Sequence, residues 1–81
     1  MSWLKYIIEN STGMERPWIF SAQDEHRLVA KRLGVEGHVV AAGFLQITTA
    51  GANCYGSSMT LGIGSRPEDT VLVNKWAGDN V

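Results

Sequence analysis

Alternating apolar and polar residues near the start of the chain predict two short strands. The segment 3–9, WLKYIIE, alternates with a period of two, as expected for a strand. Residues 10–13 are typical of a turn, and 16–20 predict a second strand, where Pro17 indicates an edge because proline lacks the N–H donor. The first strand then carries Leu4, Tyr6 and Ile8 on one face and Trp3, Lys5 and Ile7 on the other.

A first helix is predicted over residues 22–33. Ser21 is suited to cap its N-terminus, and Gly34 is suited to end it. Asp24 is the alternative cap, and it would start the helix later, so that unbonded backbone N–H groups lie in the turn that follows Glu25. The apolar spacing predicts one inward stripe, made of Ala22, His26, Val29 and Leu33.

The middle of the chain predicts the centre of a sheet. The run 39–47, VVAAGFLQI, does not alternate, as expected for a strand that is covered on both faces. It lies in a region, 37–65, that contains no Asp, Glu, Lys or Arg. Residues 48–53 are predicted to form a connection, and 54–60 the next strand.

A second helix is predicted at 66–77. Ser65 and Glu68 have the spacing of a capping box, and a proline follows in the first turn. Val71 and Val73 favour the alternative, the second arm of a hairpin, because β-branched residues suit strands. Together the segments predict one α+β domain over residues 1–81, with a small mixed sheet of about four strands and two helices.

Composition narrows the range of partners. The chain has 81 residues and a formal net charge of −1, which argues against nucleic acid and anionic membrane as partners. Cys54 is the only cysteine, so an internal disulfide and a thiolate metal cage are excluded. With no secretory signal or apolar stretch of membrane-spanning length in the sequence, we expect a cytoplasmic protein.

The segment 54–64, CYGSSMTLGIG, combines glycines with short hydroxyl side chains. Glycine permits backbone conformations that other residues avoid, and Ser57, Ser58 and Thr60 offer small hydrogen-bond donors. This combination suits a loop that receives an anion. The same residues are also common in ordinary turns, which is the simpler interpretation.

Five ordered segments resemble the Janus family, the phosphohistidine phosphatases. The resemblance covers nearly the whole chain, and YGSSMTLG is its most specific part. In order, the segments are LKYII (4–8), EH (25–26), AAGFLQI (41–47), YGSSMTLG (55–62) and NKWAGDNV (74–81).

The resemblance implies a hydrolase that removes a phosphoryl group from histidine in a protein or peptide, with no metal or other cofactor. It implies that Lys5 and His26 are catalytic. The phosphate-binding residues that it implies are Arg27, through its backbone amide, and Ser58, Met59 and Thr60. A lysine supplies positive charge, and an imidazole titrates near neutral pH, so both suit phosphoryl transfer.

This chain departs from the family pattern at several positions. Ala41-Ala42-Gly43 replaces a glycine run, and Arg27 and Thr60 stand where the family has smaller residues. The family also closes with a further strand, so this sequence resembles a shortened member, and we expect a second copy to cover the open sheet edge as a homodimer.

Two other functions compete with hydrolysis. One is a module that binds phosphate or a phosphopeptide without turnover. The other is a small interaction protein that uses the surfaces of Trp3, Trp18 and Trp76.

Overall fold

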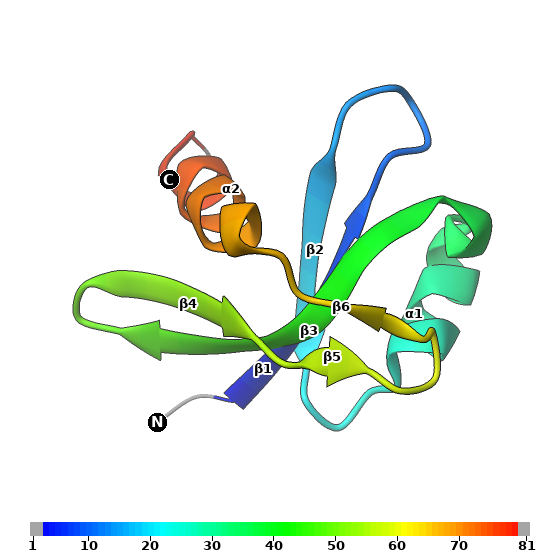
Figure 1. Cartoon of the computed structure of the whole chain (residues 1–81), viewed down its shortest axis with the longest axis horizontal. Helices are drawn as coiled ribbons and strands as arrows, with labels where there is room; N and C mark the ends of the chain where they lie inside the picture. Colours follow the sequence, from blue (N-terminus) through cyan, green and yellow to red (C-terminus); the bar gives the residue numbers. More distant parts are fainter. Residues whose placement is uncertain (1–2, 80–81) are drawn as a thin grey trace.

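Two hairpins build the main sheet of the computed structural model, which describes residues 3–79 (Figure 1). The sheet order is β2-β1-β3-β4, and each neighbouring pair is antiparallel. The prediction of about four strands is confirmed, but the prediction of a mixed sheet is wrong. Although β2 and β3 run in the same direction, β1 lies between them and is antiparallel to both. The strands are β1 (Trp3–Glu9), β2 (Arg16–Ser21), β3 (Val39–Thr48) and β4 (Gly51–Tyr55).

The two helices pack on opposite faces of this sheet, which gives an α+β fold (Figure 1). Helix α1 (His26–Leu33) is followed by the short 3-10 helix η1 (Glu36–His38), and α2 (Pro67–Asp79) comes last. Successive side chains of β1 point to opposite faces of the sheet, so β1 contributes to a hydrophobic core on each face. The α2 face buries Tyr6, Ile8, Ala41, Leu45 and Val73, and the α1 face buries Ile7, Ala30, Val35 and Ala42.

The first helix begins at His26, four residues later than predicted. Ser21 folds the intervening residues into a turn, because its carbonyl oxygen accepts from the Asp24 N–H and its hydroxyl accepts from the Gln23 N–H. Glu25, in an extended conformation, is the N-cap, so neither Ser21 nor Asp24 caps the helix. Gly34 ends the helix with φ of 73°, as predicted. The predicted stripe holds for buried His26, whereas Leu33 is exposed and Ala30 is buried in its place.

The predicted boundaries of the fourth strand were wrong. The Thr48 hydroxyl closes a tight turn by donating to the Gly51 carbonyl oxygen and accepting from the Ala50 N–H, so β4 starts directly after it. Gly56, at φ of 76°, then bends the chain out of the sheet. The residues beyond it form a separate hairpin that lies against β3, made of β5 (Ser57–Ser58) and β6 (Ile63–Gly64) (Figure 1).

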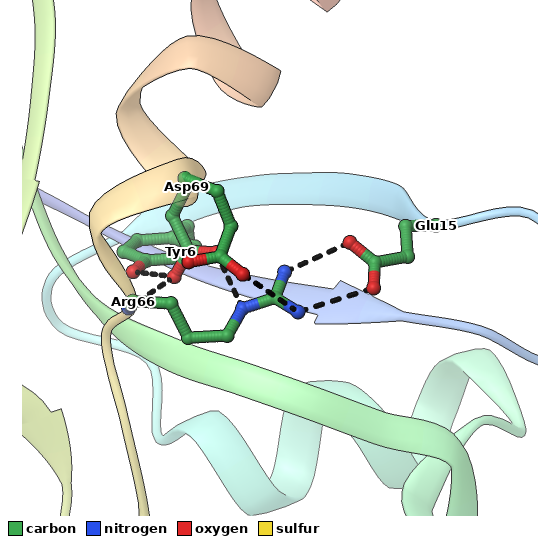
Figure 2. Close-up of polar contacts among 5 residues, drawn as sticks. Tyr6, Glu15, Arg66 and Asp69 are labelled. Atoms are coloured by element: carbon green, nitrogen blue, oxygen red, sulfur yellow. Dashed lines mark hydrogen bonds and ion pairs between the residues drawn. The ribbon is translucent and has the colours of Figure 1, made fainter.

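The predicted second helix is confirmed, which rules out the hairpin alternative. Its first turn is fixed by Asp69, whose Oδ2 atom accepts from the Arg66 backbone N–H at 2.8 Å. Figure 2 shows Asp69 at the centre of a polar network that also includes Tyr6 of β1 and Glu15 of the β1–β2 loop. The Arg66 guanidinium donates to Asp69 through Nε, at 2.9 Å, and to both carboxylate oxygens of Glu15. The network therefore joins α2 to the first hairpin.

Side chains of α2 cover the outer edge of β4. The Asn74 amide accepts from the Ala52 N–H and donates to the Ala52 carbonyl oxygen, both at 2.9 Å, as a neighbouring strand would. The Thr70 hydroxyl accepts from the Cys54 N–H at 3.0 Å. This edge is thus protected against pairing with another strand.

Candidate functional site

A pocket of about 530 Å³ opens at the N-terminal end of α1, on the α1 face of the sheet. The pocket is formed by β1, the start of α1, β3, the end of β4 and the segment that follows β4. The pocket is lined by Lys5, Glu25, His26, Phe44, Tyr55, Gly56, Ser57, Met59 and Thr60. Four residues predicted for the site, Lys5, His26, Met59 and Thr60, are therefore brought together.

The imidazole of His26 is held by the backbone of β3. Its Nε2 atom lies 2.8 Å from the carbonyl oxygen of Gly43, and because a carbonyl can only accept, Nε2 carries the proton. The lone pair then resides on Nδ1. His26 lines the pocket, and Nδ1 is the ring nitrogen that remains able to accept a proton.

Two phenylalanine rings orient the same imidazole. Phe20 and Phe44 meet it edge to face, with ring centroids 5.6 and 5.9 Å away. Burial lowers the pKa of His26, the bond to Gly43 opposes that shift, and the charge of Lys5 adds to it. The pKa of His26 is therefore below its ordinary value, and the ring is neutral at pH 7, as a general base must be.

Lys5 lines the pocket from β1, on the same face of that strand as Ile7. Its Nζ atom donates to the Asp24 carbonyl oxygen at 2.8 Å and sits 5.9 Å from the centroid of the Phe44 ring. Within the described residues Lys5 forms no ion pair with a carboxylate, so its positive charge is available to an anion.

The hydroxyl residues of the 57–60 segment divide into two roles. Ser58 is only 2% exposed, and its Oγ atom accepts from the Leu61 N–H and lies 3.3 Å from the Thr60 hydroxyl, so Ser58 holds the turn instead of lining the pocket. Ser57 and Thr60 line the pocket, and Met59 stands on its rim, 95% exposed.

The side chain of Arg27 points to solvent. It is exposed and lies 3.9 Å from the Glu36 carboxylate, outside the pocket lining. Its backbone N–H belongs to the first turn of α1, where the first helical bond runs from the Val29 N–H to Glu25, so the amide has no intrahelical partner. Glu25 also lines the pocket, and the negative charge of this exposed residue opposes anion binding.

The pocket lining also includes four residues that were not predicted to be catalytic or phosphate-binding: Glu25, Phe44, Tyr55 and Gly56. Ser57 was predicted only as a small hydrogen-bond donor of the segment 54–64. Phe44 pairs with Lys5 across β1 and β3 and with Tyr55 across β3 and β4, and its ring stacks on Tyr55 at 6.0 Å. A correct register for β4 would have identified this aromatic floor. Ser57 takes the place expected for Ser58 because the bend at Gly56 shifts which hydroxyl faces the pocket.

Comparison with protein-family models, with curated proteins and with solved structures found no match for this chain. Within residues 3–79, no three His, Cys, Asp or Glu side chains are grouped as a metal ion would require. Neither helix of this region combines the length and apolarity needed to cross a bilayer.

Proposed function

We propose that the pocket binds a phosphoryl group and that the chain hydrolyses phosphohistidine in a protein or peptide. One observation carries the proposal: Lys5 from β1 and His26 from α1 face the same cavity as the hydroxyl groups that follow β4. A cation, a neutral base and small donors around one space are what phosphoryl transfer requires, because it depends mainly on positioning and on electrostatic stabilisation.

Each group has a defined role in the proposed reaction. Lys5 neutralises one phosphoryl oxygen, and Ser57 and Thr60 donate hydrogen bonds to others, with the Arg27 amide as a further donor. The Nδ1 atom of His26 takes a proton from water as the new O–P bond forms. The P–N bond breaks, and the substrate imidazole leaves with a proton from solvent, after which His26 returns its proton to solvent. The reaction as proposed uses no metal ion or other cofactor.

The rim of the pocket supports a protein or peptide substrate. Met59 is an almost fully exposed apolar side chain beside the cavity, and a free phosphate ion would make no use of it. The single cysteine, Cys54, is free, and we place the proposed reaction in the reducing environment of the cytoplasm.

A binding module that holds the phosphoryl group without hydrolysis is the second candidate. It is favoured by the burial of His26, which is only 4% exposed, since a base must reach the attacking water. In this case Lys5 and the hydroxyl segment would bind the anion as described, and the imidazole would serve to support the pocket.

Phosphate release from a phosphohistidine peptide, measured with a chelator present, separates the two. His26→Gln is the sharpest variant, because the glutamine amide can keep the donor to Gly43 while removing the base at Nδ1. We expect it to lower kcat/KM by about 100-fold or more, whereas His38→Gln, at the exposed histidine of η1, leaves the rate unchanged. Peptide binding without turnover would favour the binding module, and the absence of both would contradict either function.

A further inference from the structure

The outer edge of β2 presents backbone groups whose direction follows from the register of the sheet. The N–H and carbonyl groups of Ala52 bond to Asn74, so they point away from β3. In antiparallel sheets the backbone groups of successive residues point alternately to one neighbouring strand and to the other. The register therefore tells, for each pair of opposite residues, whether their groups point toward each other or away from each other. The registers of β3 and β1 therefore point Pro17, Ile19 and Ser21 outward, which agrees with proline having no N–H for the ladder.

Two of the six potential backbone groups on this edge are absent or already used. Pro17 has no N–H, and the carbonyl oxygen of Ser21 accepts from the Asp24 N–H at 3.0 Å. The remaining donors are the N–H groups of Ile19 and Ser21, and the remaining acceptors are the carbonyl oxygens of Pro17 and Ile19. Within residues 3–79 no bond outside the strand ladders occupies these four groups.

We propose that a second copy of the chain pairs antiparallel with this edge, about a twofold axis at Ile19. In that register Ile19 exchanges two hydrogen bonds with Ile19 of the partner subunit, and the Ser21 N–H donates to the carbonyl oxygen of Pro17 of the partner subunit. Pro17, which has no N–H to donate, thus lies opposite the Ser21 carbonyl of the other copy, which already accepts a hydrogen bond. The twofold axis produces the same arrangement at the other end of the pairing. All four open groups are satisfied. An arbitrary strand could also pair with these four groups, but its own carbonyl opposite Pro17 and its own N–H opposite the Ser21 carbonyl would be left without a partner.

Side chains along β2 also suit this pairing. Ile19, 46% exposed, meets its own counterpart, and Trp18 falls opposite Phe20 of the partner subunit, an aromatic cross-strand pair. Arg16 falls opposite Ala22, so no like charges face one another. On the α2 side the edge borders an apolar groove of about 300 Å³ formed with Val73, Trp76 and Ala77, where a neighbouring copy would exclude water.

Sedimentation equilibrium over a range of concentrations tests the dimer, independently of any phosphatase activity. We expect wild-type protein to reach twice the monomer mass and Ile19→Lys to remain monomeric, because two ammonium groups would face each other at the axis. Ile47→Lys is the matched control, since Ile47 is equally exposed (47%) on β3, and it should dimerise like wild type. A mixture of Ile19→Lys and Ile19→Glu should recover the dimer through opposite charges.

Hydrogen exchange on wild-type protein adds a test that needs no variant. The amides of Ile19 and Ser21 should be slow to exchange at high concentration and fast after dilution. A monomer at every concentration would overturn the proposal. A dimer that survives Ile19→Lys, or one in which these two amides stay unprotected, would also overturn it, because the interface would then lie elsewhere or involve a different partner edge.

Discussion

The phenol of Tyr6 donates a 2.6 Å hydrogen bond to the Oδ2 atom of Asp69, and both side chains are fully buried. Burial, and then the neighbouring carboxylate, raises the pKa of the phenol, so Tyr6 remains the donor throughout the physiological range. The bond joins β1, which also carries Lys5, to the first turn of α2. The position of Lys5 therefore depends in part on a contact made on the opposite face of the sheet.

Removing this carboxylate should be costly. Asp69→Ala leaves the Tyr6 hydroxyl and the Arg66 guanidinium without their buried acceptor, and we expect the free energy of unfolding to fall by about 3–5 kcal/mol. Glu68→Ala is the control, because its exposed carboxylate lies 4.0 Å from the same guanidinium and should change stability by less than about 0.5 kcal/mol. Urea unfolding checks both variants, and equal losses would contradict the central role of Asp69.

The protonation of His26 should follow from its burial. Its pKa is lowered in the folded protein, so the unfolded chain binds a proton first as the pH falls. We therefore expect stability from this group to be present above about pH 6.5 and to decline as the pH falls from there toward the folded pKa. The ring resonances of His26, followed by NMR against pH, should show a midpoint below about 6.5. A midpoint above that value would mean that burial does not lower the pKa of His26.

Gly43 should not tolerate a side chain. A Cβ atom there would lie 2.5 Å from the backbone oxygen of Tyr55, where neither strand can give way cheaply. We expect Gly43→Ala to lower the free energy of unfolding by about 1–3 kcal/mol and to displace the carbonyl that holds His26. In Gly37→Ala the new methyl group meets nothing within 4 Å, so this variant should unfold like wild type. Equal free energies of unfolding for Gly43→Ala and Gly37→Ala would refute the close approach at Gly43.

The edge protection by Asn74 should contribute measurably to stability. Its amide makes three hydrogen bonds to backbone groups of Ala52 and Thr70. Asn74→Ala leaves the half-buried groups of Ala52 unpaired, and we expect a loss of about 1–3 kcal/mol in thermal or urea unfolding. Lys75→Ala, at the neighbouring exposed position, should be close to neutral. A neutral Asn74→Ala would mean that water replaces the amide without cost.

The sequence predicted those elements whose signals are local. The alternation of residues 3–9 predicts a strand at those same residues, and Gly34 predicts the end of α1 at its own position. Both predictions agree with the structure. The start of α1 was mispredicted because Ser21, although a suitable helix cap, instead accepts the hydrogen bonds of the turn that precedes the helix. The fourth strand was misplaced because the Thr48 hydroxyl closes a tight hairpin in a segment that resembles a loose connection.

The candidate site was predictable to a similar extent. Lys5 and His26 stand out as the cation and the imidazole of an otherwise apolar face, and they do share a pocket. The choice between Ser57 and Ser58 depends on the backbone at Gly56, whose left-handed conformation no side-chain pattern encodes. The Gly43 carbonyl, which sets the tautomer of His26, is a backbone group that becomes a partner only after β3 and α1 are assembled.

The proposed function requires that Lys5 and His26 face one site for a phosphoryl group, and a titration with inorganic phosphate followed by ¹⁵N NMR tests this most directly. We predict saturable shifts confined to the amides of residues 26–28 and 56–60, retained in Lys31→Gln and lost in Lys5→Gln with the fold intact. No shifts, or shifts centred on exposed Lys31 and Lys75 instead, would contradict it.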